Sequence, residues 1–150
     1  MPIPESLPRV PDSELDYERD LVFTHEGVPF SGIGYEERSD LGLSEVSYRD
    51  GMQHGVSRDW FPSGKLKGES RYRENSLHGT TRELDEDGHI LMEIEYEYGI
   101  VVSSRELDDH GNEIRSFEIE TKDRLYAMLE RLRTEKAWRS SDEDYDGWAQ

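Results

Sequence analysis

Two histidines are the residues whose type and spacing could place a metal ion. His54 and His78 lie 24 positions apart, and a glycine follows each of them. Imidazole nitrogens are common zinc ligands, so a repeating fold that aligned the two rings would supply a pair of ligands. No third ligand recurs with them, and the chain contains no cysteine. We therefore interpret both histidines as residues that pack beside a turn, and we predict no metal site and no disulfide.

One acidic segment is similar to the start of a calcium-binding loop. Residues 85–88, Asp-Glu-Asp-Gly, lack the third acidic position before the glycine and the distant glutamate of such a loop. We predict a turn there instead. The short Gly-Ile-Gly segment at residues 32–34 cannot cradle a phosphate. Because no nucleophile with a base and no pair of catalytic carboxylates stands out, the sequence predicts a protein that is not an enzyme and binds no cofactor.

Carboxylates are the remaining candidates for a functional site. Residues 89–98 alternate between apolar side chains on one face and glutamates on the other, which is typical of a half-buried strand. The next strand and its turn add three more acidic residues, and Arg105 is the only basic residue that we expect nearby. We predict an exposed patch that attracts a basic protein and speeds its association at low salt. The patch consists of Glu93, Glu95, Glu97, Glu106, Asp108 and Asp109.

These candidates belong to a stretch, residues 45–114, that repeats nearly the same pattern three times. A fixed period in this range predicts stacked supersecondary units. The third unit is one residue short, and it lacks the His-Gly pair of the other two. The residues that recur at a spacing of 24 are Glu45, Glu69 and Glu93, and Tyr48, Tyr72 and Tyr96.

Each repeat has two turn signals about half a period apart, which leaves room for two antiparallel strands. Because side chains alternate along a strand and the period is even, equivalent residues fall on the same face. We predict that the three tyrosines form a buried row with Trp60; the alternative is an exposed aromatic stripe that binds protein. The glutamates should form a charge ladder with Arg58, Arg82 and Arg105. The predicted fold class is mainly β: repeated antiparallel β-hairpins stacked into one elongated twisted sheet, with a C-terminal α-helix.

Other elements flank the repeats. Residues 13–17 could form a helical turn, residues 21–43 a degenerate first repeat, and residues 113–120 a last strand. Apolar residues at helical spacing predict a helix that begins at Thr121. Its apolar stripe should dock on the last hairpin or the open sheet edge; the alternative is that it binds a partner. The predicted division is a proline-rich segment at 1–20, the repeat domain at 21–120, the helix at 121–139 and an acidic tail at 140–150.

Composition narrows the choice of partner. The chain of 150 residues has a net charge of −17, and it is 33% hydrophobic and 35% charged. Such a surface repels nucleic-acid phosphates and anionic lipids, so we expect neither nucleic acid nor membrane as a partner. It favours a basic protein, or it serves only solubility. No leader and no uncharged run long enough to span a bilayer is present, so we expect a cytoplasmic location.

The repeats resemble the variant MORN repeat, and the chain resembles the bacterial YwqK antitoxin-like family. The first unit carries the motif at Tyr48, Gly51, His54, Gly55, Trp60, Gly64, Leu66 and Glu69. The second carries it at Tyr72, His78, Gly79, Gly88, Ile90 and Glu93, and the opening motif is similar to residues 29–32. Departures are Asn75 in place of a turn glycine and the missing His-Gly pair after Gly99. The resemblance implies stacked antiparallel hairpins and an antitoxin or immunity-type role.

The sequence therefore predicts a non-enzymatic protein-binding module that neutralises a basic toxin or effector through an acidic β-sheet surface. The alternative is a structural repeat scaffold that self-assembles through its sheet edge or its C-terminal helix.

Overall fold

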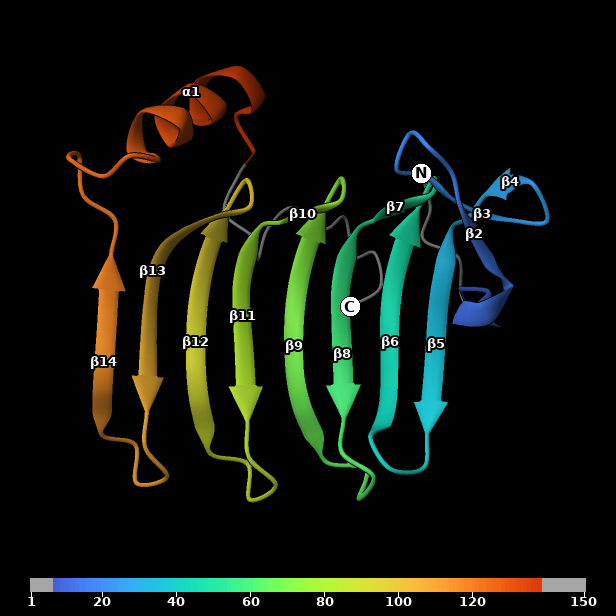
Figure 1. The fold of residues 1–150 in the computed structure, drawn as a ribbon, viewed down its shortest axis with the longest axis horizontal. Helices are drawn as coiled ribbons and strands as arrows, with labels where there is room; N and C mark the ends of the chain where they lie inside the picture. The colour runs from blue at the N-terminus through green and yellow to red at the C-terminus, as the bar shows by residue number, and fades with distance from the viewer. Residues whose placement is uncertain (1–6, 139–150) are drawn as a thin grey trace.

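The protein is mainly β, as the sequence predicts. A computed structural model describes residues 7–138 (Figure 1). Its main sheet has eleven strands, is open and is mostly antiparallel, and a second sheet has three short strands. In spatial order the main sheet runs β1 (Arg9–Pro11), β5 (Gly32–Arg38), β6 (Gly42–Arg49), β8 (Gly55–Trp60), β9 (Leu66–Arg73), β11 (Gly79–Leu84), β12 (Ile90–Glu97), β13 (Ile100–Leu107) and β14 (Glu113–Glu118). The two-residue strands β7 (Met52–Gln53) and β10 (Ser76–Leu77) extend the pairing of β6 and β9.

Two-residue turns with left-handed backbone join the strands at one end of the sheet. Asn75 adopts a φ of 68°, so it takes the conformation that a glycine would otherwise supply. The amides of the second turn residues donate to the preceding hairpin, which ties the repeats together. These bonds are Gly51 N to Phe30 O at 2.8 Å, Asn75 N to Gln53 O at 3.0 Å and Gly99 N to Leu77 O at 2.8 Å. The shortened third repeat therefore keeps the same link between hairpins.

The register defines the two faces of the main sheet, because residues directly opposite each other on neighbouring strands share a face. One face, called here the charged face, carries the row Glu45, Arg58, Glu69, Arg82, Glu93 and Arg105. The other, called the aromatic face, carries Tyr48, Tyr72 and Tyr96, each of which lies an odd number of residues from the glutamate of its repeat.

The N-terminal part differs from the sequence prediction. Residues 12–14 form a single 3₁₀ turn, and β2 (Leu15–Tyr17) follows it where a helical turn was predicted. β2 pairs with β3 (Phe23–His25), which pairs with β4 (Val28–Pro29). Of the predicted first repeat, only β5 and the first residues of β6 join the main sheet, where β5 lies beside the parallel strand β1. The Phe23 ring lies 4.9 Å from that of Tyr48, so the small sheet covers one end of the aromatic face.

The C-terminal helix docks on the last hairpin of the repeats, as predicted. α1 (Tyr126–Lys136) begins later than Thr121, because residues 120–126 form successive turns closed by the amides of Asp123 and Tyr126. Leu129 is completely buried in a cluster with Tyr98 and Ile100. α1 lies beyond the ends of β12 and β13 (Figure 1). No helix in residues 7–138 is long and apolar enough to cross a membrane, and the predicted acidic tail lies outside the described residues.

Candidate protein-binding surface

The charged face carries a ladder of alternating ion pairs, as the repeat spacing predicts. Glu93 Oε2 accepts from Arg82 Nε at 2.9 Å, and Glu93 Oε1 accepts from Arg105 Nε at 2.8 Å. Glu69 repeats the arrangement one hairpin earlier, with Arg82 Nη1 at 3.2 Å and Arg58 Nε at 3.4 Å. Each carboxylate thus lies between arginines from the strands on either side. The ladder neutralises much of the acid on this face.

Three of the six predicted patch residues lie on the charged face, but each already has a partner. Glu93 is only 18% exposed, and the hydrogen bonds from Arg105 and then Arg82 hold its pKa below the ordinary value. Glu95 accepts a hydrogen bond from the Thr80 hydroxyl. Glu97 accepts two bonds from Arg133 of α1, at 2.9 and 2.6 Å. The expectation that these glutamates are exposed beside a single arginine is therefore wrong.

The other three patch residues lie elsewhere. Glu106 is opposite Met92 and Arg115, on the aromatic face. Asp108 closes the turn after β13, where its Oδ1 accepts from the amides of Asn112 and His110, each at 2.9 Å, and the Asn112 amide is the main cause of its lowered pKa. Asp109 is an exposed residue of the same turn. The structure therefore does not bring the six carboxylates into one patch.

The groups considered as metal ligands take part in the architecture of the repeats. His78 is buried, its Nδ1 accepts from Tyr98 N at 3.0 Å, and its ring packs against Trp138 at 5.2 Å. Asp85, Asp87 and His89 offer ligand atoms within 4.8 Å of one another. Yet Asp85 Oδ1 accepts from the amides of Asp87 and His89, so this segment forms the predicted turn.

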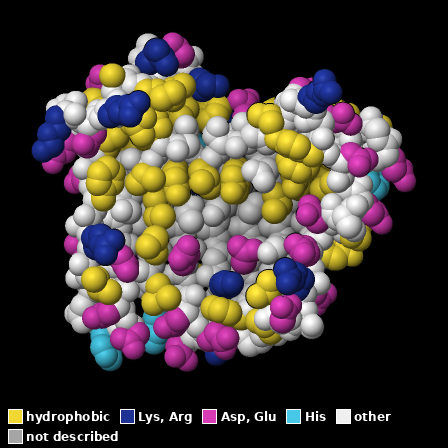
Figure 2. Space-filling model, viewed as in Figure 1, with side chains coloured by type: hydrophobic (Ala, Val, Ile, Leu, Met, Phe, Trp, Pro, Cys, Tyr) yellow, Lys and Arg dark blue, Asp and Glu magenta, His cyan; other side chains and the backbone are white. Residues whose placement is uncertain are grey.

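The tyrosine row is only partly buried. Tyr48 is covered by Phe23 and Phe30, and burial raises its pKa to about 12. Tyr72 and Tyr96 are half-buried, so their rings contribute to the surface. Trp60 is not in this row, because it pairs with Leu43 and Leu66 at the opposite end of β8, while Gly55 is the residue of β8 opposite Tyr72. Figure 2 shows apolar side chains in a band below α1 and the small sheet.

An acidic row that the sequence analysis did not identify runs parallel to the tyrosines on the same face. Its carboxylates align through Ser44, Gly68 and Met92, which occupy the strands between them. Figure 2 shows acidic side chains spaced across the lower half of this face. The members of this acidic row are Glu36, Asp59, Glu83 and Glu106.

The repeat spacing contains a signal for this row. Asp59 and Glu83 are 24 positions apart, and Glu106 follows at 23, because the third unit is one residue short. The residue type of this row changes from aspartate to glutamate along the repeats, whereas the glutamates of the ladder recur unchanged. Pairing of the acids with basic side chains, which decides whether a row is neutralised, has no such periodic signature.

Comparisons with known proteins add little. No model of a known protein family matches this sequence, and no curated protein matches it. Among solved structures, a variant of S. aureus TarM in complex with fondaparinux, alpha-GlcNAc-glycerol and UDP is similar over 69% of this chain at 16% identity, with a TM-score of 0.33. The similar region spans 23% of that protein's chain. A likeness at this level supports no conclusion about fold or function.

Proposed function

We propose that this chain is a non-enzymatic protein-binding module that binds a basic protein through the aromatic face of its main sheet. One observation carries the proposal: a row of half-exposed tyrosines lies beside a row of carboxylates on the same face. Tyrosine is enriched in the centres of protein interfaces, because its ring is apolar and its hydroxyl forms hydrogen bonds. Carboxylates beside such a centre steer an oppositely charged partner into place.

The charge of this face favours a basic partner. Within residues 7–138, none of Glu36, Asp59 and Glu83 forms an ion pair, and Asp59 accepts a hydrogen bond only from the Ser44 hydroxyl. Glu106 has a distant partner, Arg115, at 3.9 Å. The carboxylates of the ladder, in contrast, lie between arginines. The acidic binding surface is therefore assigned to the aromatic face, and the net charge of −17 adds long-range attraction to a cationic protein.

The proposed biological role is that of an antitoxin or immunity-type protein of the YwqK antitoxin-like family. The support is the resemblance of the repeat motifs at Tyr48–Glu69 and Tyr72–Glu93 to that family. A basic effector such as a nuclease suits an acidic sheet, because its active-site cations would face the carboxylates.

Purification from the native cell tests this function, followed by kinetics with the partner obtained. We expect one stoichiometric partner of basic charge. Reversing the row with Glu36→Lys, Asp59→Lys and Glu83→Lys should slow association by about an order of magnitude at low salt. The matched control reverses three exposed turn residues, Glu86→Lys, Asp87→Lys and Asp109→Lys, and changes the net charge equally. Recovery of no partner across salt conditions, or equal slowing in both variants, would contradict the proposal.

A structural scaffold that self-assembles is the second candidate. The observation in its favour is β14, whose six residues are all exposed at the end of the main sheet. Repulsion between copies that each carry a charge of −17 opposes it. Light scattering distinguishes the two functions, because a protein that stays monomeric at high concentration cannot be a self-assembling scaffold.

A further inference from the structure

β14 is an edge strand with free backbone groups. It pairs with β13 on one side, and no other strand of the described chain pairs with its outer side. The Ile119 amide donates to Val102 O at 2.9 Å, so it points toward β13. Because backbone groups alternate in direction along an antiparallel strand, the Phe117 amide also points inward, and those of Ser116 and Glu118 point to the open edge. Such an edge is a template for one more strand.

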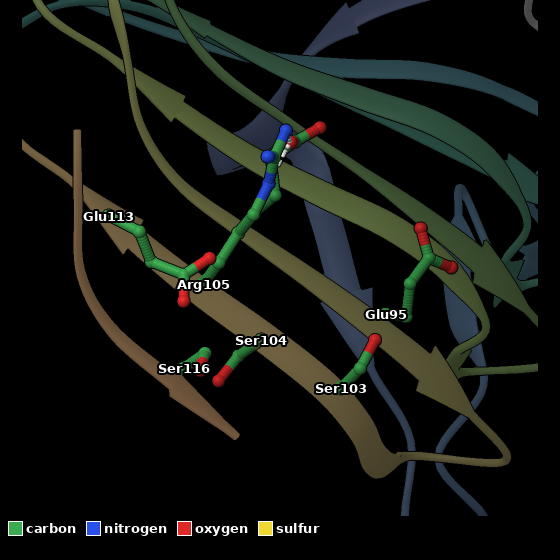
Figure 3. A pocket seen from close by; sticks show the side chains of 7 residues that line it. Glu95, Ser103, Ser104, Arg105, Glu113 and Ser116 are labelled. Carbon is green, nitrogen blue, oxygen red and sulfur yellow. Dashed lines mark hydrogen bonds and ion pairs between the residues drawn. The ribbon is translucent and has the colours of Figure 1, made fainter. Parts of the chain in front are cut away.

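A polar pocket of about 310 Å³ lies beside this edge (Figure 3). Figure 3 shows the carboxylates of Glu113, from β14, and Glu95, from β12, on opposite sides of it. Arg105, which also lines the pocket, donates through Nε to Glu93 Oε1 at 2.8 Å. That arginine is engaged by the ladder. The two other carboxylates therefore give the pocket a negative potential, and serines at 103, 104 and 116 supply hydroxyls in its lining.

We propose that the β14 edge and this pocket bind an extended basic segment of another protein, which adds a strand to the sheet and places a lysine or arginine in the pocket. In this mode of recognition, main-chain hydrogen bonds provide affinity, and pockets for alternate side chains provide specificity. Ile114 and Phe117, which are 60% and 44% exposed, supply apolar contacts along the strand. The site goes beyond the proposed function, because it needs neither the tyrosine row nor the acidic row.

Charge decides between a basic segment and a second copy of this chain. Two copies would each bring a charge of −17 to the edge. Each would also place its own Glu113 and Glu118 beside the other's strand, where like charges are destabilising. A segment with lysines at alternate positions instead matches Glu95 and Glu113, and its other side chains face away from the pocket.

An NMR titration of the full chain tests the site, with a short peptide of alternating lysine and valine as the probe. We expect amide shifts to centre on Ser116 and Glu118. A peptide methylated on the backbone nitrogens that would face β14 should not bind, because it cannot complete the strand ladder. The double variant Glu95→Gln and Glu113→Gln should weaken binding about fivefold, as expected for loss of partly exposed ion pairs. The matched control, Glu26→Gln and Glu37→Gln, removes the same charge from two exposed residues outside the acidic row and far from β14, and it should bind as the parent does.

Three results would overturn the proposal. Equal binding of the methylated peptide would show that only general charge attraction operates. Shifts centred on another element would place the peptide elsewhere. Concentration-dependent broadening of the β14 amides without peptide would show that a second copy occupies the edge. The proposed function fails separately. A native partner that protects the tyrosine row but leaves β14 unchanged supports that function and refutes this site. Peptide binding at β14 without any native partner supports this site and refutes that function.

Discussion

Replacing Glu93 with glutamine measures what the ladder contributes to stability. The Glu93 carboxylate is 18% exposed and lies between Arg82 and Arg105, which are 36% and 52% exposed. Glutamine keeps the shape but removes the charge, so both guanidinium groups lose a charge-assisted hydrogen bond. Exposed ion pairs contribute roughly 0.2–1 kcal/mol each, and hydrogen bonds to charged groups roughly 1.5–3 kcal/mol. Because both arginines are partly screened by water, we expect the free energy of unfolding to fall by about 2 kcal/mol in total.

Urea denaturation of the two proteins gives this difference, and Glu106→Gln is the control. Glu106 lies on the neighbouring strand, and its partner Arg115 is 3.9 Å away and 80% exposed. Both variants lose one negative charge, so the relief of general repulsion in this acidic protein cancels when the two are compared. We expect it to change the free energy of unfolding by no more than about 0.5 kcal/mol. Equal losses in the two variants would refute the view that the ladder differs from ordinary surface ion pairs.

The contribution of Glu93 should also depend on pH. The arginines lower its pKa in the folded protein below the ordinary value of 4.5. Between these two pKa values the unfolded chain binds more protons than the folded protein, so stability rises with pH. The stabilisation is therefore complete above pH 4.5 and is lost as the pH falls through the folded pKa. The difference between the parent and Glu93→Gln should shrink on acidification; a difference that stays constant through this range would contradict the assignment.

Three further substitutions follow from the structure. Leu129→Ala should lower the free energy of unfolding by about 2–4 kcal/mol and release α1 in hydrogen exchange, because this side chain is completely buried, whereas exposed Met128→Ala should have little effect. Asn75→Gly keeps the left-handed turn but loses the bond to the Gln53 amide at 2.8 Å, so urea denaturation should show a loss of about 1 kcal/mol. Burial raises the pKa of Tyr48 from 10.0 to about 12, so its neutral form favours folding. This stabilisation is present below pH 10 and is lost as the pH rises toward 12, so Tyr48→Phe should reduce the alkaline loss of stability measured by denaturation.

The periodicity of the sequence by itself determined the hairpins, the ladder and the tyrosine row. A period of 24 is even, so equivalent residues return to the same face whatever the surrounding structure does. For this reason the common face of Glu69 and Glu93 follows from their spacing alone, whereas the strand register places Arg82 between them. The sequence is also compatible with the left-handed turn at Asn75, since asparagine is among the few residues that tolerate a positive φ.

Only the tertiary structure decided which carboxylates are neutralised and which remain available to a partner. Glu97 is paired with Arg133, 36 positions away, because α1 folds back over the last hairpin. The acidic row runs across the strands from β5 to β13, and its alignment depends on register, which local patterns do not encode. The strands β1 to β4 are two or three residues long, so they are too short to show an alternation of apolar and polar side chains in the sequence. Their pairing depends on packing against the repeat sheet. The sequence determines the charge of each residue, but whether a carboxylate can bind a partner protein depends on the neighbours that folding brings to it from elsewhere in the chain.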